Sequence, residues 1–250
     1  YSYGLTNDRL RLYANDFVRI PFSAPTPPEQ RKIADFLTAV DRRIGQLIQK
    51  KAWLTDYKQG AMQQLFTQAI RLKDDHGDEF PDWEEKRLGT FLFERKEYQV
   101  KSEGLPHISL TVEGVVHKTD RYDRDFLVND DASKKYRVTR VGDLCYNPAN
   151  LKFGVIDFNE LCDGIFSPIY ITFEIRGIVP NYLKALIKRS TFLNAVRKYE
   201  QGTVYERQAV HPKDFVKGRI ALPSIAEQTK IANFLSAIDR KIESVTTQIN

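Results

Sequence analysis

One amphipathic segment occurs twice in this chain, and the repeat limits the possible folds more than any other feature. EQRKIADFLTAVDRRI begins at residue 29 and EQTKIANFLSAIDRKI begins at residue 227, with 11 of 16 positions identical. The match continues upstream without gaps, so that Asp16-Phe17-Val18 corresponds to Asp214-Phe215-Val216. A repeat at this scale indicates that one structural module is used twice. Residues 4–44 and 202–242 are therefore two copies of one module, and the segment between them is not repeated.

Each copy begins with a pattern that is typical of a helix start. Thr26 and Ser224 each precede a glutamate by three residues, which is the spacing of a capping box. In such a box the hydroxyl accepts a hydrogen bond from the third helical amide, and the glutamate side chain reaches back to the capping residue. Pro27 suits the first helical position because its φ angle is already fixed near the helical value.

Beyond these starts, apolar residues recur at spacings of four and three, which predicts a coiled-coil seam. The first helix is predicted to run to about Ile70, and its length of roughly 60 Å suits an assembly strut. We expect the two helices to pack antiparallel; the alternative is a pair of ordinary amphipathic helices in one compact domain. The seam residues are Ile33, Leu37, Val40, Ile44, Leu47, Leu54, Ala61 and Leu65, interrupted by Lys51 and Lys58, and then Ile231, Leu235, Ile238, Ile242, Val245 and Ile249.

Composition adds weaker constraints. The chain of 250 residues is 42% hydrophobic and 28% charged, as expected of a globular protein, and its net charge of +5 weakly favours an anionic partner. Cys145 and Cys162 lie outside any C-x-x-C pattern, which indicates a reducing, cytoplasmic compartment. No apolar run approaches the roughly 20 residues that span a bilayer, so we expect no membrane contact.

The segment between the copies has a different character. Polar residues with Gly and Pro at 74–89 mark a boundary. Short β-rich pieces follow, and then a helical stretch at 180–200 with a break near Ser190. The predicted fold class is α+β: a globular domain with a twisted β-sheet plus helices, flanked by two long helices that form an antiparallel coiled coil. The β-rich pieces are residues 107–112, 140–147, 153–158 and 167–175.

Several residues of this domain have the chemistry that DNA contact requires. Cations bind phosphates, and Arg, Gln, Tyr and hydroxyl groups on loops can read base edges. The segment GTVYERQAV at 202–210 is the best loop candidate, although an ordinary turn and a solvated charged surface are the alternatives. The candidate DNA-binding residues are Lys118, Arg121, Tyr146, Lys152, Thr203, Tyr205, Arg207 and Gln208.

Catalytic patterns are not found in the sequence. The four histidines show no paired-ligand spacing, and there is no G-x-S-x-G, G-x-x-x-x-G-K-[ST] or G-x-G-x-x-G motif. YNPAN at 146–150 is similar to the base-holding loop of adenine methyltransferases, but Asn150 stands where a stacking aromatic is needed. We read Asn147-Pro148 as a turn, and expect no enzyme activity, cofactor or metal. The histidines are His76, His107, His117 and His211.

Taken together, these motifs resemble the specificity subunits of type I restriction-modification enzymes. The resemblance rests on the two P-[TS]-x-x-E-Q-x-K-I-A-x-F-L-x-A-[VI]-D-x-x-I blocks, which are its most specific part, and covers essentially the whole chain. Weaker support comes from FPDWEEKRLG at 80–89, YNPANLKFG at 146–154 and GTVYERQ at 202–208.

The resemblance implies a division of labour. Such subunits carry two target-recognition domains that each read half of a bipartite DNA sequence, separated by antiparallel helices that act as a ruler and dock methyltransferase subunits. Restriction subunits complete the complex. The implied domains are the tail of a first recognition domain (1–24), the central helix (25–73), a complete recognition domain (74–222) and the start of the distal helix (223–250). The implied docking residues are Phe36, Leu37, Phe234 and Leu235.

Two other functions stay open at this point. The chain could be an adenine N6-methyltransferase fragment with its own cofactor site, or a coiled-coil scaffold without DNA contact. The sequence also leaves open the bases read, the spacer length and the oligomeric state. It does not decide between a cropped piece of a longer subunit and a natural half-subunit that associates with a second copy.

Overall fold

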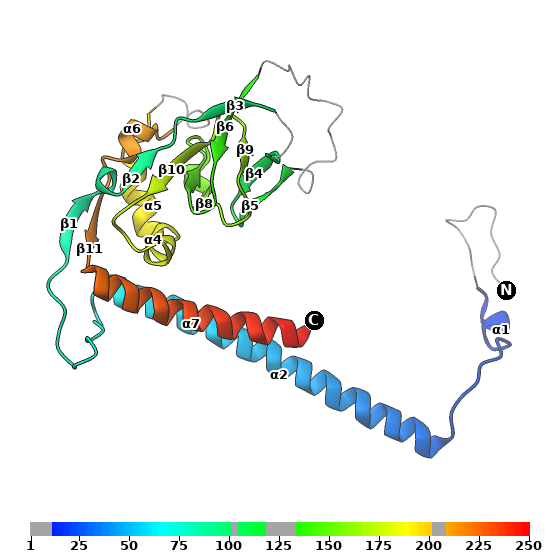
Figure 1. Ribbon diagram of the computed structural model, residues 1–250. Helices are drawn as coiled ribbons and strands as arrows, with labels where there is room; N and C mark the ends of the chain where they lie inside the picture. The colour runs from blue at the N-terminus through cyan, green and yellow to red at the C-terminus, as the bar shows by residue number, and fades with distance from the viewer. Residues whose placement is uncertain (1–11, 102–104, 119–133, 202–208) are drawn as a thin grey trace. The chain divides into compact units, whose positions relative to one another are not determined.

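The structure is a computed structural model that describes residues 12–101, 105–118, 134–201 and 209–250 (Figure 1). It divides into two compact units, residues 1–52 with 245–250 and residues 53–244. The larger unit contains the sheets, the short helices between residues 180 and 215, the end of the first long helix and most of the last one. The boundaries predicted for the four sequence segments stay predictions.

Both copies of the repeat form long helices, as the sequence predicts. Helix α2 spans Pro27–Phe66 and helix α7 spans Ile225–Ile249. The first helix ends a few residues before the predicted Ile70, because Gln68 adopts a positive φ of 59° that stops the helical path. The apolar periodicity therefore predicts both helices correctly but places the end of α2 a few residues too late.

The helix starts confirm half of the predicted capping box. The Ser224 hydroxyl accepts a hydrogen bond from the Glu227 amide at 3.2 Å. The Glu227 side chain, however, accepts bonds from Arg71 and Trp83 instead of reaching back to Ser224. A glutamine bond is instead common to both copies: Nε2 of Gln228 donates to the carbonyl of Pro223 at 2.9 Å, and Nε2 of Gln30 to that of Pro25 at 2.8 Å.

Within the larger unit, α7 and the end of α2 run antiparallel. Lys58 pairs with Asp239 at 2.5 Å. Further along α2, Met62 lines a cavity together with Leu235 and Ala232, which come earlier in α7. Residue numbers that increase along α2 are therefore matched by residue numbers that decrease along α7, as in an antiparallel pair. Lys58, which interrupts the apolar seam in the sequence, is neutralised by Asp239 across the two helices.

The sequence predicts a twisted β-sheet with helices, and the described strands form four small antiparallel sheets. Each of these strands is three to five residues long, at the short end of the usual range. Strand β1 (Glu84–Arg87) pairs with β11 (Arg219–Leu222), and β4 (Ile108–Thr111) with β5 (Gly114–His117). The order in the largest sheet is β2 (Leu92–Glu94), β10 (Ile171–Ile175), β7 (Leu144–Tyr146) and β8 (Ile156–Phe158); in the remaining sheet it is β3 (Tyr98–Val100), β6 (Lys135–Thr139) and β9 (Gly164–Phe166).

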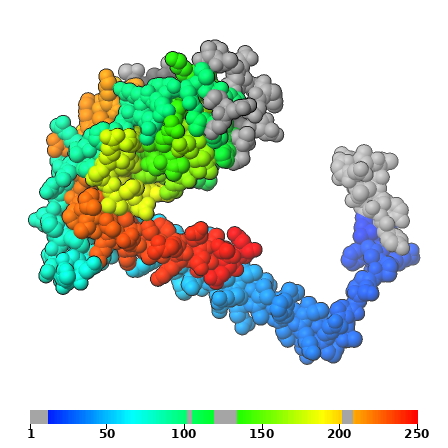
Figure 2. All heavy atoms as spheres, viewed as in Figure 1, coloured from blue at the N-terminus to red at the C-terminus, as the bar shows by residue number. Residues whose placement is uncertain are grey.

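Short helices join the sheets to α7. The predicted break near Ser190 is confirmed, since α4 spans Pro180–Ile187 and α5 spans Ser190–Arg197. Helix α6 spans Pro212–Phe215, and the 3-10 turns η2 and η4 span Leu88–Thr90 and Leu151–Phe153. Figure 2 shows the side chains of α7 closing against those of α4.

The core of the larger unit is aromatic at its centre. The ring of Phe215 lies 4.6 Å from that of Tyr146 and 5.6 Å from that of Phe173, centroid to centroid. The same cluster includes Ile231 and Leu235 of α7. The sheets and the start of α7 therefore share one core.

The helices of the two repeat copies begin at corresponding positions but differ in burial. Helix α1 (Ala14–Phe17) occupies the positions that correspond to α6, yet Phe17 is 65% exposed and Phe215 is fully buried. In the long helices, Ile33 is 45% exposed whereas its counterpart Ile231 is 1% exposed. The second copy is thus packed against its own domain, and the first copy presents the same apolar face to solvent.

Candidate nucleic-acid interface

The turn after β7 is held by side-chain hydrogen bonds. Oδ1 of Asn147 accepts hydrogen bonds from the backbone amides of Ala149 at 3.1 Å and Asn150 at 3.3 Å, which makes an Asx turn. The turn continues into η4 and ends at Gly154, whose φ of 77° favours glycine. The reading of Asn147-Pro148 as a turn is confirmed.

This turn supports the segment around residue 210. The Tyr146 hydroxyl donates to the Val210 carbonyl at 2.9 Å, and the Val210 amide donates to the Pro148 carbonyl at 3.2 Å. Gln201 and Ala209 exchange two backbone hydrogen bonds of 2.9 and 3.0 Å. We call residues 146–154 together with Gln201, Ala209 and Val210 the loop platform. It fixes both flanks of residues 202–208, which lie outside the described residues.

Tyr146 has a different role from the one predicted. Its side chain is fully buried against Phe173 and Phe215, and it has no exposed surface with which to contact DNA. Burial raises the pKa of the Tyr146 hydroxyl far above its usual value, so the group stays a neutral donor. We therefore reassign Tyr146 from DNA contact to anchoring the loop platform.

Substituting Tyr146 with Phe tests this anchor. The ring packing is kept, but the Val210 carbonyl loses its donor, and we expect a cost of about 1–3 kcal/mol in the free energy of unfolding. Amide hydrogen exchange at Ala209 and Gln201 is expected to accelerate more than exchange in α7. Tyr57→Phe, at a side chain that is 58% exposed, is the control and should change stability by less than about 0.5 kcal/mol. Equal stability of Tyr146→Phe and the wild type would contradict the proposed anchoring role of Tyr146.

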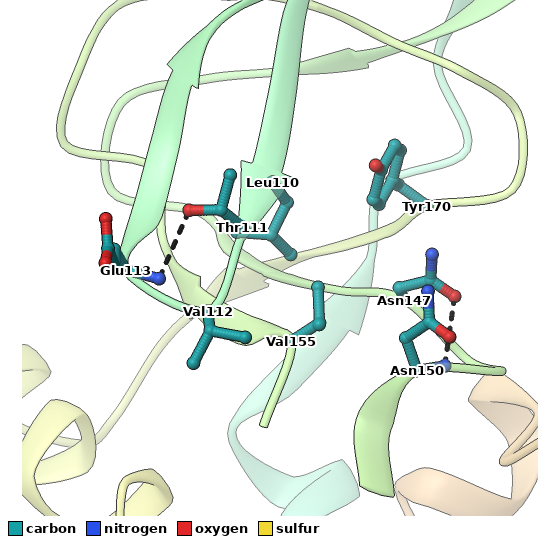
Figure 3. A pocket seen from close by; sticks show the side chains of 8 residues that line it. All are labelled: Leu110, Thr111, Val112, Glu113, Asn147, Asn150, Val155 and Tyr170. Atoms are coloured by element: carbon teal, nitrogen blue, oxygen red, sulfur yellow. Dashed lines mark hydrogen bonds between the residues drawn. The ribbon is translucent and has the colours of Figure 1, made fainter. Parts of the chain in front are cut away.

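A cavity of about 290 Å³, lined by both apolar and polar side chains, opens beside the loop platform. Figure 3 shows the two asparagines at one side, Asn150 next to Asn147, and Thr111 and Glu113 of the β4–β5 hairpin at the other. Amide, hydroxyl and carboxylate groups are those that discriminate base edges in a DNA groove. The lining residues are Leu110, Thr111, Val112, Glu113, Asn147, Asn150, Val155 and Tyr170.

Sequence reasoning did not include Asn150, Thr111 or Glu113 among the candidates. The hairpin turn is held by Thr111, whose Oγ1 donates to the Gly114 carbonyl at 2.9 Å and accepts from the Glu113 amide at 3.1 Å. Gly114 has a φ of 129°. The sequence TVEG between two apolar stretches is a hairpin signal, but nothing in the sequence indicates that this turn lines the same cavity as the asparagines.

The remaining predicted DNA-contact residues fall into two groups. Lys118 directly follows β5, is half-buried, and its amide donates to the His107 carbonyl at 3.0 Å. Lys152 lies in η4, with its Nζ 5.2 Å from the centroid of the Phe153 ring. The others lie outside the described residues: Arg121, Thr203, Tyr205, Arg207 and Gln208.

The predicted docking residues differ in their exposure to solvent. Phe36 and Leu37 are 68% and 54% exposed. Phe234 is half-buried beside Tyr57 in a cavity of about 340 Å³. The prediction of Leu235 as a docking residue is wrong. Leu235 is buried in the core of the larger unit, because the seam of α7 packs against this chain's own domain. Its side chain is not accessible to a partner.

Groups suited to catalysis are scarce in the described part of the chain. Burial raises the pKa of the Cys145 thiol well above its usual value, so it is held as a thiol rather than as a nucleophilic thiolate. Within the described residues there is no cluster of three His, Cys, Asp or Glu side chains suited to a metal ion. None of the helices described has the length and apolar character needed to cross a membrane.

The architecture defines a class: a small α+β domain with a supported loop, joined to two helices that repeat one sequence. No family model matches the sequence. The chain is 28% identical over 244 residues to a curated protein named as the type I restriction enzyme MjaX specificity subunit of Methanocaldococcus jannaschii, covering 88% of this chain and 53% of that protein. The resemblance to such subunits indicated by the sequence is thereby confirmed.

Solved structures share the fold. The HsdS subunit from Thermoanaerobacter tengcongensis matches with a TM-score of 0.54 at 16% identity, over 88% of this chain and 52% of that one. The type I restriction-modification S subunit from M. genitalium matches with a TM-score of 0.53 at 13% identity, over 99% of this chain and 63% of that one. The chain therefore spans about half to two thirds of the length of these proteins, and the predicted α+β fold class is confirmed.

Proposed function

We propose that this chain is the DNA-recognition part of a type I restriction-modification complex, and that residues 74–222 read one half of a bipartite target. The observation that carries the proposal is the loop platform, whose own residues fix the chain at Gln201 and Ala209 and which borders a cavity lined in part by asparagine, threonine and glutamate side chains. The similarity to specificity subunits along most of the chain supports it. The bases are read by side chains, while the catalytic steps belong to partner subunits.

We also propose a domain organisation, which the unequal burial of the two repeat copies supports. We assign residues 1–24 to the end of a first recognition domain, because residues 14–17 repeat α6 while Phe17 lacks the aromatic packing of Phe215. Residues 25–73 are the central helix, and residues 223–250 begin the distal helix. The body of the first recognition domain would cover the face that includes Ile33.

Partner subunits are expected on the helices. Exposed Phe36 and Leu37, together with half-buried Phe234, are the proposed contacts for methyltransferase subunits. Restriction subunits would join through that complex. The cytoplasm is the proposed location, in keeping with two cysteines that are both free thiols.

Salt-dependent DNA binding tests the proposal. In the complex of the intact subunit with its methyltransferase partners, Lys152→Ala or Lys118→Ala is expected to lower the slope of log K against log salt by about 1, because each lysine neutralises one phosphate. Lys86→Ala is the matched control, because Lys86 lies in β1 and pairs with Glu84 at 2.9 Å. Fluorescence anisotropy over a range of salt concentrations gives the slopes.

Three results would count against the proposal. Slopes unchanged in both lysine variants would mean that this side of the domain does not face DNA. Saturable binding of S-adenosylmethionine to the isolated chain, measured by calorimetry, would favour a methyltransferase fragment. A complex that assembles but binds no DNA would favour a scaffold.

A further inference from the structure

A buried ion pair joins the recognition domain to α7. Oε2 of Glu227 accepts hydrogen bonds from Nη2 of Arg71 at 2.9 Å and from the indole nitrogen of Trp83 at 3.2 Å. The Glu227 side chain is 1% exposed. A carboxylate buried to this degree is costly unless it is paired and hydrogen-bonded, so Arg71 and Trp83 stabilise Glu227 in this position.

The same cluster gathers the connections between the helices and the domain. Arg71 follows the end of α2, and its Nη2 also donates to the carbonyls of Phe80 at 3.0 Å and Pro81 at 2.7 Å. Trp83 immediately precedes β1, and Glu227 lies in the first turn of α7. The Glu227 carboxylate therefore connects three segments: the one that follows α2, the one that precedes β1 and the first turn of α7.

The next residue adds a second tie. Oε1 of Gln228 accepts the backbone amide of Val179 at 3.0 Å, directly before α4. Its Nε2 donates to the Pro223 carbonyl, and the side chain is buried. Gln228 thus holds α4 against the start of α7 with both ends of its amide.

The pair of residues belongs to the helix repeat and not to the variable domain. Glu29 and Gln30 stand at the corresponding positions of α2 and are exposed. Gln30 already makes the bond to Pro25 that Gln228 makes to Pro223. A residue pair kept at both helix starts, with only one of them engaged in this chain, indicates a joint that serves whichever domain is attached.

We propose that Glu227 and Gln228 are positioning residues that fix the angle of the recognition domain on its helix, and so set the distance and helical phase between the two half-sites. This inference rests on the proposed function. One base pair of spacer changes the half-site separation by about 3.4 Å and its phase by about 35°. A joint that loosens by that amount would accept the neighbouring spacer lengths without any change in the bases read.

The test uses the complex of the intact subunit and DNA in which the half-sites are fixed and the spacer is shortened or lengthened by one base pair. The wild type is expected to prefer its own spacer by at least about tenfold in methylation rate, as for a mismatched site. In Glu227→Gln and Trp83→Phe, the preference is expected to fall several-fold while the half-site sequences stay the same. Asp75→Asn is the matched control, because Asp75 pairs with Lys230 of α7 at 2.8 Å in an exposed ion pair, and it should keep the wild-type preference.

The outcomes separate the two proposals. Unchanged spacer preference in both joint variants, with methylation intact, would overturn the positioning role. Equal loosening in Asp75→Asn would also overturn it, because any ion pair near the helix start would then suffice. If Glu227→Gln does not fold, Trp83→Phe, which keeps an aromatic ring, decides alone. Failure of the proposed function looks different: the half-site sequence would not follow the recognition domain in any variant.

Discussion

Replacing Phe215 with alanine is expected to lower the free energy of unfolding of the larger unit by about 3–5 kcal/mol. The ring is fully buried and stacks on Tyr146 and Phe173, with Phe192 at its edge. Its removal leaves a cavity that neighbouring rings cannot fill, because interiors are close-packed. Urea unfolding followed by tryptophan fluorescence measures the loss, since Trp83 packs against the same core.

The repeat supplies the matched control for this variant. Phe17 occupies the corresponding position in the first copy, on a helix with the same bounds within the repeat, but it is 65% exposed. Phe17→Ala should change stability by less than about 0.5 kcal/mol in the chain of 250 residues. Similar losses in the two variants would contradict the conclusion that only the second copy is packed against its domain.

The second large effect is expected at Asp143. Its carboxylate accepts two hydrogen bonds from Arg95, at 2.7 and 2.9 Å, and one from the Arg140 amide at 2.9 Å. The side chain is 3% exposed. Asp143→Ala leaves the Arg95 guanidinium partly buried without its partner, which typically costs about 3–5 kcal/mol. In the wild type the hydrogen bond to Asp143 raises the pKa of the Arg95 guanidinium. In the variant that bond is gone, but a guanidinium keeps its charge in proteins, so Arg95 cannot escape the cost by deprotonation.

An exposed pair of the same geometry is the control for Asp143. Arg176 donates to both oxygens of Glu174 at 2.8 and 2.9 Å, with side chains 62% and 40% exposed. Glu174→Ala should therefore cost no more than about 1 kcal/mol. Thermal and urea unfolding of both variants give the comparison. Equal costs would show that the burial of Asp143 contributes nothing to its pairing.

The helices and their pairing could be predicted because the repeat carries local signals. Ser224 caps α7, the apolar spacing marks the seam, and the break near Ser190 follows from chain composition. These are properties of neighbouring residues. The sheets were predicted less well, because strand pairing depends on contacts between residues that are far apart in the chain.

The roles of individual residues could not be predicted, because they depend on which side chains the fold buries and the sequence does not show this directly. Tyr146 and Leu235 have side chains common at interfaces, yet the fold buries both. The sequence predicts Glu227 as a local capping residue, but its carboxylate accepts hydrogen bonds from Arg71 and Trp83, which are distant in sequence. Lys58 looked like an interruption of the seam until Asp239 was placed opposite. In each case the partner lies on another element.

The most direct test of the central claim is the methylated-adenine motif of cells that carry the intact complex, before and after residues 74–222 are exchanged for the corresponding domain of a relative. If these residues read DNA, one half of the bipartite motif changes and the other half stays the same. A motif that is untouched by the exchange, in a complex that still methylates, would contradict the proposed function and place DNA recognition elsewhere in the complex.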